Sequence, residues 1–426
     1  MAKLGAPARA CRGKRVVGQA ARHRGKAKRI VRGFSGFSAL RLAATTCLIG
    51  LAASAEAQTA TVSVACRQAV LMDADSQSFL FERNADELAS PASTAKIMTA
   101  ELLFRALKEG KVNLEQTYEI SEKAWREGGA PSKGSSMFAS LKSQVRIEDL
   151  IRGLLIDSGN DAAIAIAEGL SGTEEAFGEA MTRRARELGL KRSGFTNAWG
   201  RSDPKQKTTV REMAQLSAHV IQTYPDYYKY FGEKTFTWNK ITQQNRNPLL
   251  LMNIGADGLK TGNIDESGFA LVGSAVENNQ RLIVALNGCK TANERADDAR
   301  KLLLWGFRSL EPKSLFDAGE TIGTVPVYGG QPHDVPVAAA QKVKVFLPRG
   351  TGERLQGKIV YDGPLVAPIK KGTVVARLKL TRGQALALDI PLEAQEDVAV
   401  GSLPRRALDA GFEFAGQMMR KYVLKK

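Results

Sequence analysis

The sequence predicts an α+β protein in which one antiparallel sheet with a helical region is followed by a small all-β sandwich. Three observations lead to this fold class. Strand patterns occur at residues 68–83 and return at 258–286, helical patterns fill the stretch between them, and short alternating segments follow residue 312. The length of 426 residues exceeds one ordinary core, which also favours two domains.

The first predicted elements are a β-hairpin and a long helix. The apolar runs QAVLMDA (68–74) and FLFER (79–83) flank the turn DSQS, as in a hairpin. The helix is expected to begin at Ser90 and Pro91, because serine can cap a helix and proline suits its first turn. Good helix formers continue this pattern to residue 109.

Helical periodicity dominates the middle of the chain. The expected helices cover residues 147–156, 161–170, 174–188 and 208–223. Strand patterns return at 258–263, 268–276 and 281–286, and a helix over 292–310 is expected to close the first domain. A sheet assembled from both ends of a domain, with helices between, is the α+β arrangement.

The segment after residue 312 changes to period-two patterning. Apolar residues alternate through Val343, Val345 and Leu347 and again through 374–380. Several short strands of this kind, separated by Gly and Pro, predict a β-sandwich over 316–400. We therefore divide the chain into residues 1–57, 58–311, 312–401 and 402–426.

Basic residues are concentrated at the N-terminus. The net charge is +17, and residues 1–41 contain twelve Lys and Arg and no acid, which leaves +5 for the rest. This distribution argues against nucleic acid as a partner. An apolar run at 42–51 and the sequence Ala55-Glu56-Ala57 follow, as in a secretory signal that is cleaved after Ala57. We expect residues 1–57 to be a signal peptide and the mature protein to be exported to the periplasm.

Cysteine and histidine are scarce beyond the signal. Only Cys66 and Cys289 remain, without Cys-x-x-Cys spacing, so no structural zinc site is expected. The two cysteines could pair in an oxidising compartment or stay as buried thiols. His219 lies in a predicted helix and His333 in a loop, so neither a Ser-His-Asp triad nor a histidine-ligated metal is expected.

A serine nucleophile can work without histidine if a deprotonated lysine is its base. Ser93 and Lys96 lie three residues apart, so a helix places both on one face. The dipole at the helix N-terminus favours negative charge on the Ser93 oxygen. Burial and a second cation would help Lys96 to lose its proton.

Spacing alone is weak evidence, because Ser202 and Lys205 share it. That pair, however, lies in a predicted loop with a proline between the two residues. The first pair is distinguished by two further motifs. Ser158-Gly159-Asn160 lies at a break between two helical patterns, and Lys260-Thr261-Gly262 lies on a predicted strand whose glycine permits close backbone approach.

S-x-x-K, S-x-N and K-T-G in this order are the signature of penicillin-binding proteins and serine β-lactamases. The surrounding residues resemble the low-molecular-mass D-alanyl-D-alanine carboxypeptidases, such as penicillin-binding proteins 5 and 6, over about residues 65–310. The matching stretches are PASTAKIMTA, SEKAWREGG, EDLIRGLLIDSGNDAAIAIAEGLSG, NRNPLL and DGLKTGNIDESGFALVGSA. A β-lactamase fits less well, because no matching glutamate loop lies between S-G-N and K-T-G.

The resemblance implies a transpeptidase-like domain that hydrolyses the D-Ala-D-Ala bond of peptidoglycan pentapeptide stems and is acylated by β-lactam antibiotics, without a cofactor or metal. Ser93 would attack the carbonyl carbon, Lys96 would take the serine proton, and Ser158 would pass a proton to the leaving amine. Asn160 would hold Lys96 and the substrate amide.

The resemblance also implies how the substrate is held. Lys260 and Thr261, with Gly262, would meet the substrate carboxylate, and Arg246 in NRN could assist them. The backbone N–H groups of Ser93 and Asn263 would form the oxyanion hole.

The chain departs from the family at two positions. Many relatives have histidine where this chain has Asn263, which affects the expected rate and pH profile. Asp157 precedes S-G-N where an uncharged residue is common, and its carboxylate could make Lys96 harder to deprotonate.

Two alternative functions stay open at this point. One is a D,D-endopeptidase that cleaves cross-links with the same motifs, and the other is a non-catalytic wall-binding protein with the same fold.

The C-terminal segment 402–426 has apolar residues near helical spacing and several basic residues. This pattern predicts an amphipathic helix that contacts the membrane surface peripherally.

Overall fold

The computed structural model describes residues 62–349, 355–363, 365–382, 385–404 and 406–407. The predicted signal peptide and residues 408–426 of the predicted C-terminal helix lie outside the described residues. Within the described ranges, no helix combines the length and apolar character needed to cross a membrane.

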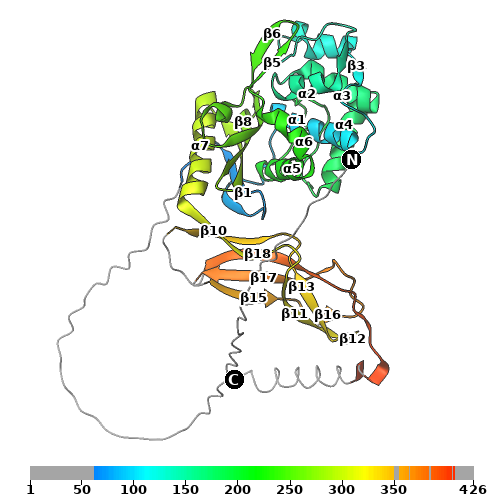
Figure 1. Cartoon of the computed structure of the whole chain (residues 1–426), viewed down its shortest axis with the longest axis vertical. Coiled ribbons are helices and arrows are strands. Elements are labelled where there is room, and N and C mark those ends of the chain that lie inside the picture. Colours follow the sequence, from blue (N-terminus) through cyan, green and yellow to red (C-terminus); the bar gives the residue numbers. More distant parts are fainter. Residues whose placement is uncertain (1–61, 350–354, 364, 383–384, 405, 408–426) are drawn as a thin grey trace, which may run out of the picture. The chain divides into compact units, whose positions relative to one another are not determined.

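A five-stranded antiparallel sheet organises the N-terminal domain, in the order β2-β1-β9-β8-β7 (Figure 1). Its strands are β1 (Gln68–Asp73), β2 (Phe79–Arg83), β7 (Ala256–Ile264), β8 (Gly268–Glu277) and β9 (Gln280–Cys289). The two ends of the domain thus share one sheet, as the sequence predicted. Strand β7 is an edge strand, so one side of its backbone has no neighbouring strand.

Alternate residues of the strands pack into two different cores. In β1, Val70 and Met72 join the core formed with the helical region, whereas Ala69 and Leu71 join a core on the opposite face. Helix α7 (Ala292–Ser309) covers that opposite face, as Figure 1 shows. Both faces of the sheet are therefore buried, as its almost unbroken apolar strands require.

The helical region lies between β2 and β7 in the sequence. Its helices are η1 (Ala92–Ala95), α1 (Lys96–Lys108), α2 (Ile147–Leu155), α3 (Asn160–Ser171), α4 (Glu174–Glu187), α5 (Val210–Thr223) and α6 (Pro225–Tyr228). Short helical turns η2 (Ala124–Gly128), η3 (Ala130–Ser132), η4 (Lys229–Gly232) and η5 (Pro248–Leu251) connect them. Two small two-stranded sheets complete the region: β3 (Thr117–Glu119) pairs with β4 (Gln144–Arg146), and β5 (Thr235–Trp238) forms a hairpin with β6 (Ile241–Gln244).

The predicted start of the first long helix is wrong in detail. Ser90 does not cap it: Pro91 takes the position before the first turn, and the Ser90 Oγ has no hydrogen-bond partner among residues that the structure describes. The Ser90 carbonyl instead accepts hydrogen bonds from Ser267 Oγ (3.2 Å) and Asn287 Nδ2 (3.1 Å). These bonds hold Ser90 against the sheet, away from the helix N-terminus.

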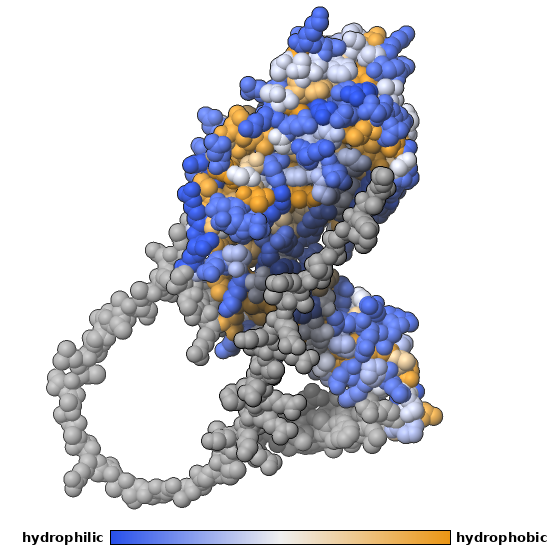
Figure 2. Space-filling model, viewed as in Figure 1, coloured by the Kyte–Doolittle hydropathy of each residue, from blue (hydrophilic) through white to orange (hydrophobic). Residues whose placement is uncertain are grey.

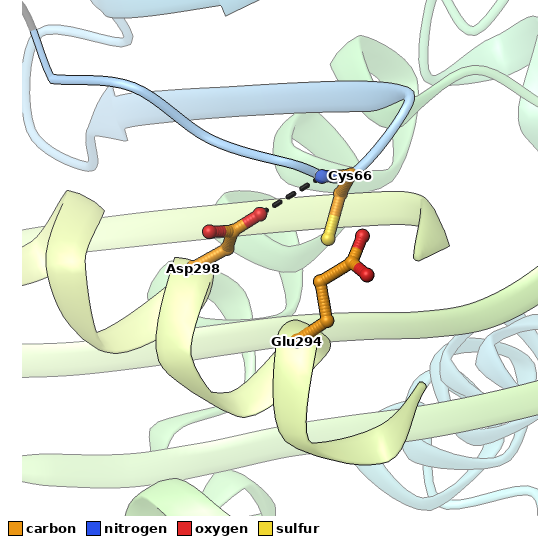
Figure 3. Close-up of side chains that lie close together, drawn as sticks. All are labelled: Cys66, Glu294 and Asp298. Carbon is orange, nitrogen blue, oxygen red and sulfur yellow. Dashed lines mark hydrogen bonds between the residues drawn. The ribbon is translucent and has the colours of Figure 1, made fainter. Parts of the chain in front are cut away.

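Cys66 and Cys289 form a disulfide, which decides the alternative that the sequence left open. Figure 3 shows Cys66 beside Glu294 and Asp298 of α7. Asp298 accepts hydrogen bonds from the backbone N–H groups of Ala65 (2.6 Å) and Cys66 (2.8 Å). The Cys66 sulfur is bonded to Cys289, and the Asp298 carboxylate accepts backbone hydrogen bonds. We therefore interpret this cluster as a structural element that holds the start of β1 in place.

The C-terminal domain is all-β, as predicted. Its strands are β10 (Leu310–Phe316), β11 (Thr321–Tyr328), β12 (Gly330–Gln331), β13 (Asp334–Ala338), β14 (Val343–Pro348), β15 (Leu355–Val360), β16 (Leu365–Val366), β17 (Val374–Arg382), β18 (Ala385–Ala394) and β19 (Ala399–Val400). Six of them form one sheet in the order β15-β17-β18-β13-β11-β16. Valine and leucine residues from these strands share one core.

The face of the described residues seen in Figure 2 is mainly polar. Figure 2 shows hydrophilic residues over most of the viewed face, with hydrophobic residues in smaller areas between them.

Candidate active site

The start of helix η1 is held in an unusual backbone conformation. Ala92 has φ +48°, which non-glycine residues rarely adopt, and such strain is concentrated at functional sites. Gly200 and Gly262 make room for this turn. A Cβ at Gly200 would lie 1.8 Å from the Ala92 carbonyl oxygen, and one at Gly262 would lie 3.2 Å from Ser93 N. The strand that carries K-T-G therefore packs directly against the residues that present Ser93.

Lys96 connects three parts of the site. Its Nζ lies 3.0 Å from Ser93 Oγ, 2.8 Å from Asn160 Oδ1 and 2.9 Å from the Trp199 carbonyl oxygen. Lys96 is fully buried, whereas Ser93 is partly exposed. The first and second motifs are thus brought together through one side chain, with the serine hydroxyl within reach of solvent and of a ligand.

The Lys96 amine is poised to be a base. Burial lowers its pKa well below the ordinary value, and the positive charges of Lys260 and Arg246 lower it further, against the opposing charge of Asp161. A neutral amine can accept the Ser93 proton, whereas a protonated lysine side chain cannot. This geometry would allow Ser93 to act as a nucleophile with Lys96 as its base.

The S-G-N motif forms the turn between α2 and α3. Ser158 has φ +59° and is 2% exposed, and Asn160 begins α3 with its side chain directed at Lys96. The Asn160 N–H donates to the Ser135 carbonyl (2.8 Å), and Gly159 N–H donates to Gly153 (2.8 Å). These bonds fix the strained turn on both sides.

The K-T-G motif lies in the centre of edge strand β7. Lys260 and Thr261 are 2% and 6% exposed, whereas the next residue after Gly262, Asn263, has an exposed side chain. Burial, with the positive charges of Arg246 and Arg295, lowers the pKa of Lys260 to about 7, against the opposing charge of Asp157. An anion bound at Lys260 would interact with three basic groups, which is the usual environment for a carboxylate.

Arg246 and Arg295, whose charges act on Lys260, come from different elements. Arg246 donates from Nη1 to Ser135 Oγ, and Asn245 and Asn247 on either side of it hold the surrounding backbone. Arg295 lies in the first turn of α7, with its guanidinium carbon 5.6 Å from the centroid of the Phe269 ring. The Arg295 Nε is buried and has no hydrogen-bond partner among the residues described. Sequence reasoning did not identify Arg295, because no motif contains it.

Asp161 was also missed, although it directly follows S-G-N. It is fully buried and accepts hydrogen bonds from Ser136 Oγ (2.7 Å) and from the backbone N–H groups of Met137 (3.0 Å) and Ala139 (3.2 Å). This carboxylate therefore ties down the loop whose residue Ser135 contacts both Asn160 and Arg246. Asp161 positions the site without being part of its reacting groups.

The Ser202 and Lys205 pair lies in a loop, as expected. Ser202 Oγ donates to Glu266, and Lys205 is exposed. No hydrogen bond joins the two side chains within the described residues. The structure thus separates the two S-x-x-K matches clearly.

Asp157 has no hydrogen-bond partner for its Oδ1 in the described parts of the chain, and the residue is 1% exposed. Burial and the charge of Asp161 raise its pKa to about 7, against the opposing charges of Arg246 and Lys260. Because the pKa of Asp157 is higher in the folded than in the unfolded protein, folding is favoured when the carboxyl is protonated and opposed when it is ionised. Its contribution is therefore lost as pH rises from about 4, the unfolded value, through about 7.

Asp157→Asn is expected to raise the free energy of unfolding by up to about 4 kcal/mol at pH 8 and by about 1.5 kcal/mol at pH 5, because the folded-state pKa of about 7 lies above the unfolded value. Urea denaturation at the two pH values measures this difference. Asp226→Asn, at an exposed aspartate, is the control and should give no pH-dependent gain. An equal effect of Asp157→Asn at both pH values would contradict the burial of a titrating carboxyl here.

Taken together, a partly exposed serine, a buried lysine with a lowered pKa and a group of three cations are the arrangement of serine enzymes of the Ser-Lys acyl-transfer class. The D-alanyl-D-alanine carboxypeptidase family model matches residues 53–291, and the model of the penicillin-binding protein 5 C-terminal domain matches residues 310–400. The chain belongs to the D-alanyl-D-alanine carboxypeptidase family.

Similar proteins span most of the chain. D-alanyl-D-alanine carboxypeptidase DacA of Haemophilus influenzae is 39% identical over 72% of this chain and 79% of the relative. DacC of Escherichia coli is 38% identical over 84% of this chain and 90% of the relative. The crystal structure of penicillin-binding protein 5 from Haemophilus influenzae superposes with a TM-score of 0.70, at 36% identity over 80% of this chain and 99% of that structure. The family and fold implied by the sequence motifs are therefore confirmed.

Proposed function

We propose that this chain is a serine carboxypeptidase that removes the terminal D-alanine from peptidoglycan pentapeptide stems through an acyl-enzyme on Ser93. The observation that carries the proposal is the 3.0 Å contact of the buried Lys96 Nζ with Ser93 Oγ. It provides an amine with a lowered pKa next to the only partly exposed residue of the segment 91–96.

In the first half of the reaction, Lys96 takes the Ser93 proton while Oγ attacks the carbonyl carbon between the two D-alanines. The backbone N–H groups of Ser93 and Asn263 stabilise the negative oxygen that forms. Ser158 passes a proton to the leaving nitrogen, and terminal D-alanine departs as the carbon–nitrogen bond breaks. Water then attacks the ester, gives its proton to the base and releases the shortened stem.

The other site residues hold the substrate. Lys260 and Thr261 bind its terminal carboxylate with help from Arg246, and Gly262 allows the peptide to lie close to β7. Asn160 binds the substrate amide while it orients Lys96. Ser93, Lys96 and Ser158 thus carry out the reaction, and the other residues bind the substrate.

The charge on Lys260 is expected to limit activity at high pH. Its pKa near 7 in the free enzyme means that carboxylate binding weakens as the pH rises through this range. We expect kcat/KM to rise as Lys96 loses its proton and to fall again as Lys260 loses its own.

Lys260→Ala should slow acylation by peptide and penicillin about a hundredfold, since a charge-assisted contact to the carboxylate is lost.

A Lys260→Arg variant tests whether loss of the Lys260 charge causes the fall of kcat/KM at high pH. Its cation does not titrate near neutral pH, so the falling limb of kcat/KM should disappear. Acylation of Lys260→Ala at the rate of the unchanged protein would refute the binding role.

Pentapeptide and cross-linked muropeptides separate the proposed activity from the endopeptidase alternative. Release of D-alanine from the pentapeptide with little cleavage of cross-links supports the carboxypeptidase. The reverse preference would indicate an endopeptidase, and no reaction with either substrate or with fluorescent penicillin would indicate a non-catalytic wall-binding protein.

We also propose that the protein is exported to the periplasm and contacts the outer face of the cytoplasmic membrane through residues 402–426. The Cys66–Cys289 disulfide supports an oxidising compartment. Removing the residues after Ser402 should move the protein from the membrane to the soluble fraction without loss of peptide hydrolysis. A full-length protein that is already soluble at low salt would contradict the anchor.

A further inference from the structure

The β5–β6 hairpin, at the top of the view in Figure 1, is anchored at its base. Phe236 is buried in the core of the helical region, and the partly buried Trp238 packs against the same core. Asn245, which directly follows β6, donates from Nδ2 to the carbonyls of Phe231 (3.1 Å) and Glu233 (2.9 Å). The base of the hairpin is therefore fixed to the domain.

Side chains of the hairpin, and of the segment that follows it, donate hydrogen bonds to the loop of residues 135–138. The pairs are Asn239 Nδ2 with the Phe138 carbonyl (2.9 Å), Gln243 Nε2 with the Ser136 carbonyl (2.8 Å), and Arg246 Nη1 with Ser135 Oγ. The loop is also held from the helical region, because the Asp161 carboxylate accepts from Ser136 Oγ (2.7 Å) and from Met137 N–H (3.0 Å). The hairpin, Arg246 and residues 135–138 thus form one continuous surface, which we call the hairpin wall.

The hairpin wall connects the second motif with the third. On one side, the Ser135 carbonyl accepts a hydrogen bond from Asn160 N–H (2.8 Å). On the other side, the charge of Arg246 acts on Lys260 of the K-T-G motif. The wall consequently lies at the end of the site where these two motifs face each other.

The proposed binding mode places the leaving residue of the substrate at this end. Its carboxylate lies at Lys260 and Thr261, and the scissile carbonyl lies at the Asn263 N–H. The leaving residue therefore extends from Asn263 toward Lys260 and Arg246. A terminal D-alanine brings only a methyl side chain to this position, whereas in a cross-link the leaving amine carries the rest of a second stem.

We propose that the hairpin wall limits the leaving group to a small D-amino acid and excludes the second stem of a cross-link. Asn239 and Gln243 determine this specificity without touching the substrate, because their side chains hold the hairpin against the loop. The inference rests on the proposed carboxypeptidase function. It adds a physical reason why this site favours the terminal D-alanine over a cross-link that the same motifs could cleave.

Two synthetic peptides test the size limit in the full-length protein. Both begin with diacetyl-L-lysyl-D-alanine, and the last residue is D-alanine in one and D-norleucine in the other, so only the side chain of the leaving residue differs. We expect kcat/KM to be about fiftyfold lower for the D-norleucine peptide, because a fixed wall rejects a group larger than the space beside it.

The double substitution Asn239→Gly and Gln243→Ala removes both side-chain contacts of the hairpin with the loop. Glycine suits position 239, where φ is +46°. We expect kcat/KM for the D-norleucine peptide to rise at least about tenfold, with cleavage of cross-linked muropeptides rising in parallel. Release of D-alanine should change less than about threefold, because Lys260 and Arg246 still hold the carboxylate.

The matched control is Lys240→Gly with Gln244→Ala. Both residues are exposed, Lys240 also has positive φ (+64°), and neither side chain bonds to the loop within the described residues. This variant should retain the full discrimination between the two peptides. Should the Asn239 and Gln243 variant lose labelling by fluorescent penicillin, the single substitution Gln243→Ala takes its place, and we expect a smaller loss of discrimination from it.

The outcomes separate this inference from the proposed function. Equal kcat/KM for the two peptides in a protein that penicillin labels would overturn the size limit alone. Unchanged discrimination in a labelled variant without the Gln243 contact would overturn the role of the hairpin wall. A protein that is not labelled and hydrolyses neither peptide would overturn the proposed function, and the inference with it.

Discussion

Ser93→Ala is expected to abolish covalent labelling by penicillin and release of D-alanine, and to leave the fold unchanged. The substitution removes one oxygen from a partly exposed side chain, while the surrounding alanines and Lys96 stay buried. Loss of a nucleophile commonly costs on the order of 10⁶ in rate, which leaves no measurable acyl-enzyme. Gel fluorescence with a labelled penicillin measures acylation, and circular dichroism checks the fold.

Ser202→Ala is the matched control, since Ser202 has the same spacing to a lysine but lies in a loop and donates to Glu266. It should be labelled at the rate of the unchanged protein. Labelling of Ser93→Ala together with loss of labelling in Ser202→Ala would show that the nucleophile is Ser202 and not Ser93.

Lys96→Met is expected to slow acylation by at least about a thousandfold, because a positioned base commonly contributes 10²–10⁴ and Lys96 also orients Asn160. Methionine has a similar length and is compatible with a fully buried position. Noncovalent binding of a D-Ala-D-Ala peptide should persist, since Lys260 and its neighbours are unchanged. Stopped-flow acylation and binding to the unreactive variant separate these two effects.

Lys205→Met is the control for charge and should have no effect on acylation. Acylation of Lys96→Met within tenfold of the unchanged protein would show that another group takes the Ser93 proton.

The helices with strong periodicity could be predicted closely from the sequence. The pattern at 174–188 corresponds to α4 (Glu174–Glu187), whose start is capped by Thr173 through a hydrogen bond from Ala176 N–H (3.1 Å). Hairpin β5–β6 was not predicted. Its turn uses Asn239 and Lys240, both with positive φ, and lysine at such a position gives no recognisable turn signal.

The disulfide shows why distant pairings escape sequence reasoning. Cys66 and Cys289 are separated by 223 positions, and their spacing says nothing about contact. The register of β1 with β9 pairs Gln68 with Asn287, and continuing this register by two residues sets the cysteines opposite each other. Strand register, which only the folded sheet defines, therefore determines the pairing.

The candidate site also contains residues that the sequence identified and residues that only the folded structure reveals. Motif spacing identified the residues expected to react, because each motif lies on one local element. Trp199, which accepts a hydrogen bond from Lys96, and Arg295, whose charge acts on Lys260, come from remote segments without a motif. Their contribution arises from tertiary packing. It could not be read from the local pattern.

The most direct test of the central claim is to capture the acyl-enzyme with a pentapeptide stem. The purified protein would be mixed with the peptide, quenched in acid within milliseconds, digested and analysed by mass spectrometry, while free D-alanine is quantified in parallel. The account predicts one adduct, with the mass of the stem lacking its terminal D-alanine, on the fragment that contains Ser93. Release of D-alanine with the adduct on another residue, or no release at all, would contradict it.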